Sequence, residues 1–269
     1  IRDRYPAFFC VFSVVFLFGC GDADGGGTGG DGGSELVAAS VYIFEFDPSF
    51  REIPIKGAAL CELDADNCVT SNSAGWATID LPADREIAMT VEKDGYGPWV
   101  YANVTDEHFP EDYRFQMYTH ESLVAMAEDL QTPYPWIGGI VGLLRCFSPN
   151  SGVKFLPVGS TAEAVGEAFY FDAATVRYSL ELEATTYFFG LPDAPLAEGG
   201  FTEVVPGVHQ FEFAGTAGNC PHASWGWPGD APNRLRIPVL EGYTTYGSVR
   251  CDEEIPGGAS TSADSPVGE

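Results

Sequence analysis

The feature that most constrains the fold is a short run of alternating apolar and polar residues that recurs along the chain. In residues 75–82, a glycine opens the run and a proline closes it. A strand places every second residue on the same face, so Trp76 and Asp80 share one face while Ala77 and Leu81 share the other. Glycine (32 residues), proline (19) and aromatic residues (13%) are abundant. The sequence therefore predicts an all-β fold.

Residues 36–118 contain enough such runs for a first small β-sandwich. Strands are expected at 37–46, 55–63, 76–82 and 87–91. Cys61 and Cys68 bracket a polar turn. A hairpin with a disulfide across its base fits that spacing, so we predict a Cys61–Cys68 bridge.

This first module resembles a known family of β-sandwiches. The Gly75 turn, the alternating strand that ends at Pro82, the strand at 87–91 and the Asp-Gly-Tyr at 94–96 occur in that order. The order resembles the carboxypeptidase regulatory-like, or transthyretin-like, domain over about residues 55–104. The resemblance implies a non-catalytic sandwich that stabilises, adheres or acts as a spacer.

A single helix is expected at 119–130, within a connector spanning 119–136. Thr119 can cap it, and Glu121 lies in the first turn, where a negative charge suits the helix dipole. Its apolar positions share one face: Leu123, Ala127 and Leu130. Pro133 and Pro135 are expected to end it. We interpret the helix as a connector between two sandwiches; a partner-binding helix is the alternative.

Residues 137–253 predict a second sandwich with an aromatic C-terminal extension. Strands are expected at 137–146, 168–171, 176–182, 235–240 and 242–246, and as a pair within 199–213 that meets at Pro206. The 199–213 stretch resembles the regulatory-like pattern again. The fold class predicted from these observations is two tandem small antiparallel β-sandwiches joined by one short helix.

The start of the chain carries a targeting pattern. Arg2 and Arg4 precede an apolar run at 8–18, which ends in Leu-Phe-Gly-Cys at 17–20. The run is too short to span a bilayer as a helix, which needs roughly 20 residues. The pattern resembles a bacterial lipoprotein signal. The resemblance implies that the peptide is cut before Cys20 and that this cysteine carries fatty acyl chains such as palmitate.

If residues 1–19 are a signal peptide, the segment after them is a tether. Residues 20–35 are rich in Gly and Asp and lack the apolar content to form a core, so they predict a flexible linker with a reach on the order of 20 Å. The residue directly after the anchor cysteine is Gly21 and not an aspartate. In the lipoproteins of Gram-negative cells that this pattern resembles, the absence of aspartate there favours delivery to the outer membrane. The resemblance therefore implies the outer membrane of the bacterial cell envelope. Residues 254–269 predict a disordered tail.

The charge restricts the partners. The formal net charge is −26. A chain this acidic is repelled by phosphate backbones and anionic lipid surfaces, so we exclude nucleic acid as a partner. Attachment to the membrane must then come from the lipid on Cys20.

The cysteines predict disulfides and not a metal site. Of the seven, Cys10 lies in the signal and Cys20 is the anchor. The other five are Cys61, Cys68, Cys146, Cys220 and Cys251. Their spacing matches no zinc pattern. We predict a second bridge, Cys220–Cys251, with Cys146 unpaired; a Cys146–Cys251 bridge is the alternative.

No catalytic motif or paired histidine motif appears, so we predict neither an enzyme nor a cofactor or metal. The first hypothesis is a non-catalytic surface protein for adhesion, display or structural spacing, with a glycan or a surface protein as partner. The alternative is a carbohydrate-binding module that uses the aromatic residues of 225–246. Its candidate ligand-binding residues are Trp225, Trp227, Tyr243 and Tyr246, since aromatic faces stack on sugars. The competing interpretation is that these rings cover the end of the second sandwich.

Overall fold

The computed structural model describes residues 35–46, 51–106, 112–146, 152–172, 174–175, 177–186, 196–218, 220 and 225–250. The predicted signal peptide, the Cys20 anchor, the tether up to residue 34, Cys251 and the tail lie outside these residues. The predicted all-β class is confirmed, because strands dominate and the described helices are short, namely α1 (His120–Asp129) and α2 (Ala162–Val165).

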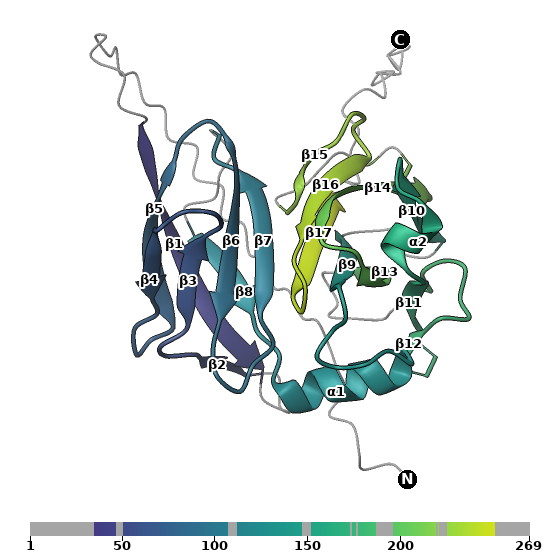
Figure 1. The fold of residues 1–269 in the computed structure, drawn as a ribbon, viewed down its shortest axis with the longest axis horizontal. Coiled ribbons are helices and arrows are strands. Elements are labelled where there is room, and N and C mark those ends of the chain that lie inside the picture. Colours follow the sequence, from purple (N-terminus) through teal and green to yellow (C-terminus); the bar gives the residue numbers. More distant parts are fainter. Residues whose placement is uncertain are drawn as a thin grey trace, which may run out of the picture.

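The first half of the chain contains strands β1 to β8 (Figure 1). They are β1 (Leu36–Phe46), β2 (Glu52–Pro54), β3 (Ala59–Glu62), β4 (Cys68–Thr70), β5 (Trp76–Pro82), β6 (Glu86–Glu92), β7 (Trp99–Val104) and β8 (Asp112–Gln116). The strand predicted at 55–63 starts too early. Gly57 adopts φ 75° between β2 and β3, a left-handed conformation that a continuous strand cannot contain.

A first small sheet is built around β1. β5 and β2 pair with β1 antiparallel, and β8 pairs with it parallel. The predicted alternation in β5 is confirmed, because Ala77, Ile79 and Leu81 are buried while Thr78 and Asp80 are exposed. The buried face packs against β3, β6 and β7 in one apolar core.

The second half of the chain contains β9 to β17. They are β9 (Gly139–Cys146), β10 (Val153–Val158), β11 (Ala168–Asp172), β12 (Arg177–Ser179), β13 (Leu196–Val204), β14 (Gly207–Gly215), β15 (Trp227–Pro228), β16 (Arg234–Val239) and β17 (Thr244–Arg250). β13 and β14 are the strand pair predicted to meet at Pro206. The strands β10, β14, β16 and β15 form a second small sheet.

A nine-stranded long sheet runs through both halves in the order β12-β11-β13-β9-β17-β7-β6-β3-β4. Its link is β17, which pairs parallel with β9 on one side and with β7 on the other. Thr244 stands opposite both Ile140 and Trp99. The sequence predicted two separate antiparallel sandwiches; the structure adds this shared sheet, and both it and the first small sheet contain parallel pairs.

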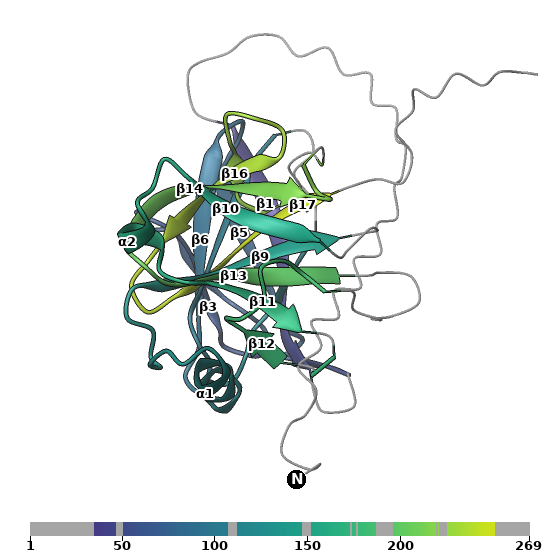
Figure 2. The same cartoon turned by 90° about the vertical axis from the view of Figure 1, so that its right-hand side faces the viewer.

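The small sheets cover opposite faces of the long sheet. Residues in register on paired strands share a face, so Tyr101 and Tyr246 both point toward the first small sheet. Val141 points the other way, into a core with β10, β14 and β16. Figure 2 shows β9, β13, β11 and β12 succeeding one another toward α1. The result is a layered body with the long sheet in the middle.

Helix α1 is the predicted connector. The Thr119 hydroxyl accepts a hydrogen bond from the Ser122 backbone N–H at 3.3 Å, which confirms the cap. Leu123 and Ala127 are buried against aromatic residues of the second half. The helix ends at Asp129 with Leu130 as its C-cap, next to the predicted end at 130, and Gln131 then adopts φ 52° ahead of both prolines.

Candidate functional site

The four aromatic residues predicted to bind a ligand lie where the two halves meet. Trp225 is 9% exposed and Tyr246 is 4% exposed, and both belong to the core under the first small sheet. The Tyr246 ring stacks on Trp99 with 4.7 Å between centroids. The Tyr101 and Trp225 rings meet edge to face, with 6.4 Å between their centroids. Rings buried this deeply present no face to a sugar.

A backbone insertion explains the burial of Trp225. In the described structure, the pairing between β17 and β7 ends at Tyr246 and Tyr101. Beyond that point, Ser248 N–H donates to the Trp225 carbonyl at 3.0 Å, and Gly226 N–H donates to the Ala102 carbonyl at 2.9 Å. The segment at 225–226 therefore fills the space where the two strands separate.

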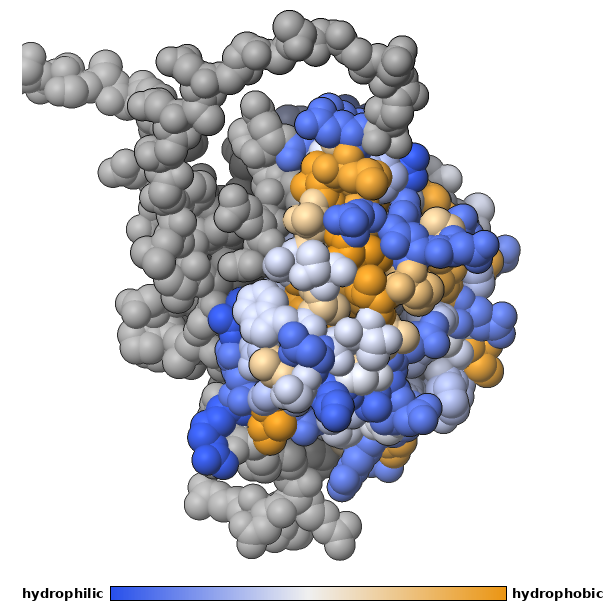
Figure 3. Space-filling view, turned by 90° about the vertical axis from the view of Figure 1, so that its left-hand side faces the viewer, coloured by the Kyte–Doolittle hydropathy of each residue, from blue (hydrophilic) through white to orange (hydrophobic). Residues whose placement is uncertain are grey.

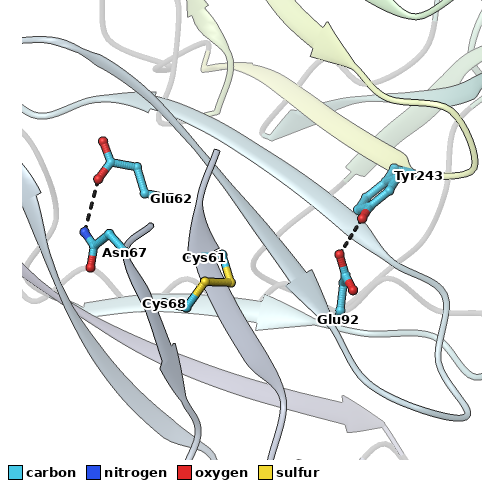
Figure 4. Close-up of a disulfide and its surroundings, with 6 residues drawn as sticks. All are labelled: Cys61, Glu62, Asn67, Cys68, Glu92 and Tyr243. Carbon is cyan, nitrogen blue, oxygen red and sulfur yellow. Dashed lines mark hydrogen bonds between the residues drawn. A yellow bond between two sulfur atoms is a disulfide. The ribbon is translucent and has the colours of Figure 1, made fainter. Parts of the chain in front are cut away.

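The other two aromatic residues join the halves through polar contacts. Trp227 Nε1 donates to the Ile87 carbonyl at 2.8 Å, and the Arg236 guanidinium lies 5.8 Å from the Trp227 ring centroid. The Tyr243 hydroxyl donates to Glu92 (Figure 4). Burial is the larger cause and the Glu92 carboxylate the smaller cause of a rise in the pKa of Tyr243 to about 12.

Trp225 and Tyr246 are buried, which agrees with the competing interpretation, in which the rings are packed. Trp227 and Tyr243 are half-buried, so a ligand-binding role for these two residues stays a prediction. All four side chains or their rings contact the first half of the chain as well as belonging to the second. Gly142 is part of the same packing, because a Cβ there would lie 2.1 Å from Tyr246 Cε1.

The predicted Cys61–Cys68 disulfide is confirmed (Figure 4). The two residues are register partners in the β3–β4 hairpin, with 4.1 Å between their Cα atoms. Next to it, the buried Glu62 carboxylate accepts hydrogen bonds from Asn67 Nδ2 at 3.1 Å and Arg85 Nη2 at 3.0 Å. The bridge and this polar cluster fix the base of the hairpin.

Cys220 is also disulfide-bonded and is 5% exposed. Its partner is a cysteine whose side chain lies outside the described part of the chain. The Cys220–Cys251 bridge and the unpaired Cys146 therefore stay predictions, as does the Cys146–Cys251 alternative.

A second aromatic cluster lies on the outer face of the first small sheet. Trp76 and Tyr42 are direct partners across β5 and β1, with ring centroids 5.1 Å apart. Arg114 is the partner of Tyr42 on β8, and its guanidinium lies 5.3 Å from the Tyr42 ring centroid. We call these three residues the outer aromatic row. Trp76 and Tyr42 are half-buried, so each ring keeps some contact with solvent.

Local structure holds the outer aromatic row in place. The Tyr42 ring stacks on buried Phe44 at 5.3 Å. Gly75 adopts φ 81°, and a Cβ there would lie 2.7 Å from the Ile43 carbonyl oxygen and 3.0 Å from Tyr42 Cε2. Only glycine leaves room for this approach. Arg114 forms an ion pair with Glu52.

Charges beside the row act on the Tyr42 phenol. Burial, and to a lesser extent the Glu52 carboxylate, raises the pKa of Tyr42 above its ordinary value, and Arg114 opposes the rise. The row therefore combines aromatic faces with the Arg114 donor and the Tyr42 hydroxyl, and the Glu52 carboxylate beside it adds an acceptor.

Sequence reasoning placed Trp76 on the same face of its strand as Asp80 but did not assemble this cluster. The alternation in residues 37–46 could have placed Tyr42 on an outer face. Arg114 gave no such signal, because its strand pairs with β1 from about 70 positions away.

The described residues contain no cluster of three or more His, Cys, Asp or Glu side chains able to hold a metal ion. Within the same residues, no helix has the length and apolar character needed to cross a membrane.

Comparison with known proteins gives no family. No family model and no curated protein matches the chain. Among solved structures, the minor pilin GBS52 of Streptococcus agalactiae has 11% identity and a TM-score of 0.22, covering 81% of this chain and 98% of that one. CBMbc (family CBM26) from Eubacterium rectale Amy13K, solved with maltoheptaose, has 10% identity and a TM-score of 0.27, covering 80% and 94%. Similarities this weak assign no function, and the lipoprotein and regulatory-like resemblances stay predictions.

Proposed function

We propose that this chain is a non-catalytic bacterial surface lipoprotein that serves adhesion, display or structural spacing. In this proposal, Cys20 carries the lipid and residues 21–34 form the tether. The β-structured body then stands off the outer membrane. The Leu-Phe-Gly-Cys pattern at 17–20 and the Gly/Asp composition after it support the anchor.

The observation that carries the spacing role is the long sheet. β17 pairs along Thr244–Tyr246 with β7 and along Thr244–Arg250 with β9, so one strand is hydrogen-bonded to both halves. The inserted Trp225 segment and the Trp227–Ile87 hydrogen bond add to this joint. A body joined in this way holds its surfaces at fixed distances, unlike two domains on a flexible linker.

The surface chemistry supports attachment through lipid. The net charge of −26 opposes binding to anionic headgroups. Among the described residues that face the viewer in Figure 3, hydrophilic residues border an apolar region.

Labelling with an alkyne analogue of palmitate tests the anchor. The matched pair is Cys20→Ser and Cys10→Ser, since both cysteines lie in the first 20 residues. We expect Cys20→Ser to lose the label and leave the membrane fraction, whereas Cys10→Ser keeps both. Label retained in Cys20→Ser contradicts the proposal.

A further inference from the structure

We propose that the outer aromatic row, Trp76, Tyr42 and Arg114, is a binding site for a neutral carbohydrate. The site is distinct from the aromatic residues of 225–246. It rests on the proposed function only in that the body must face the cell exterior to meet a glycan. Binding by the purified chain does not depend on the anchor.

The rings form a supported and partly exposed platform. Tyr42 is backed by Phe44 and fitted closely to Gly75, and Trp76 lies beside it at 5.1 Å. Their strands belong to a sheet whose other face is core. The rings are therefore ordered before a ligand arrives, which lowers the entropic cost of binding.

Polar groups surround the rings in the pattern that a sugar needs. A pyranose has a face of C–H groups, which stacks on an aromatic ring, and a rim of hydroxyls. Arg114 can donate to such hydroxyls, and Glu52, its ion-pair partner, can accept from them. Ser40 and Thr78 are register partners in the next row of the same face and add two more hydroxyls. A few polar groups around aromatic faces are typical of small-ligand sites.

The charges favour a neutral ligand. Arg114 and Glu52 offset one another, and Asp80 is exposed on the same face of β5. The chain as a whole carries −26. Anionic polysaccharides and phosphate-bearing ligands are therefore disfavoured. An aromatic surface can also dock a proline-rich peptide, but such a peptide makes little use of the hydroxyls and paired charges that flank these rings.

The test is a glycan array probed with the purified full chain, and then calorimetric titration with the best neutral oligosaccharide. The variants are Trp76→Ala, Trp76→Phe and, as a control on the other half of the chain, Val208→Ala, whose side chain is 56% exposed. We expect wild type and Val208→Ala to bind equally, Trp76→Ala to lose at least tenfold in affinity, and Trp76→Phe to lose less, since it keeps an aromatic face.

Circular dichroism of each variant checks that the fold is retained. If Trp76→Ala does not fold, Arg114→Ala, at a half-exposed position, takes its place with the same expected loss. The proposal is overturned if no array glycan binds above background, if these variants bind as tightly as wild type, or if a decaproline peptide binds through Trp76 and no neutral glycan does. None of these results bears on Cys20 labelling, which tests the anchor independently.

Discussion

Replacing Trp225 by alanine tests whether the two halves form one folding unit. The side chain is 9% exposed and lies between Tyr101 and Tyr246. A buried aromatic side chain removes about 200 Å² from water, and at about 25 cal/mol per Å² this contributes about 5 kcal/mol. Measured losses for Trp→Ala in cores are about 3–5 kcal/mol, so we expect Trp225→Ala to cost about 4 kcal/mol.

Urea denaturation under oxidising conditions measures this loss. With an m-value of about 3 kcal/mol per M, the midpoint should fall by more than about 1 M. Since Trp225 contacts both halves, far-UV circular dichroism and tryptophan fluorescence should report the same single transition. Trp76→Ala, on the outer face, is the matched control and should lose clearly less. A Trp225→Ala midpoint within about 0.3 M of wild type, or two separate transitions in wild type, would show that the halves do not unfold as one unit.

Further predictions concern the cap, the disulfide, the Tyr246 contact and the alkaline range. Thr119→Ala should cost about 1 kcal/mol in urea denaturation, because the Ser122 N–H loses its acceptor; Glu121→Ala, in the same turn, is the comparison. Cys61→Ser with Cys68→Ser should cost about 2–3 kcal/mol through a freer unfolded chain, and no change would argue against the bridge in solution. Gly142→Val should lower the melting temperature by several degrees, because the new side chain displaces the Tyr246 ring, whereas Gly218→Ala, where a Cβ would meet only the Gly215 carbonyl oxygen at 3.5 Å, should cost less. The raised pKa of Tyr243 stabilises the fold below pH 10, and this contribution is lost as pH rises from about 10 toward 12, so Tyr243→Phe should flatten the pH dependence of unfolding there.

Local patterns were enough to predict the elements that depend on near neighbours. The period-two alternation indicated the two faces of β5, and the spacing of Cys61 and Cys68 indicated the hairpin bridge. Thr119 marked the start of α1. Each of these features is decided by residues within about ten positions of one another, so propensity and spacing carry the information.

Contacts between distant strands could not be predicted in the same way. An alternating strand reveals which residues are buried but not which strand lies beside it. Nothing near β17 indicates that it pairs with β7, and Trp227 bonds to a carbonyl 140 positions away. The contacts that the aromatic residues of 225–246 make with the first half of the chain were therefore not predicted.

The sequence indicated only part of the outer aromatic row, because the row is assembled from strands that are distant along the chain. The alternation in β5 placed Trp76 on the same face as Asp80, and Tyr42 lies opposite it only because of the β1–β5 register. Arg114 joins them through a parallel pairing, which local sequence does not encode. A candidate site assembled from several strands is thus visible only in the folded chain.

The most direct test of the proposed function is mass spectrometry of the N-terminus of the protein taken from its native membrane fraction. We predict that the first residue is Cys20 and that it carries acyl chains, with residues 1–19 removed. A mature protein that retains residues 1–19, or that begins at an unmodified Cys20, would contradict the proposal.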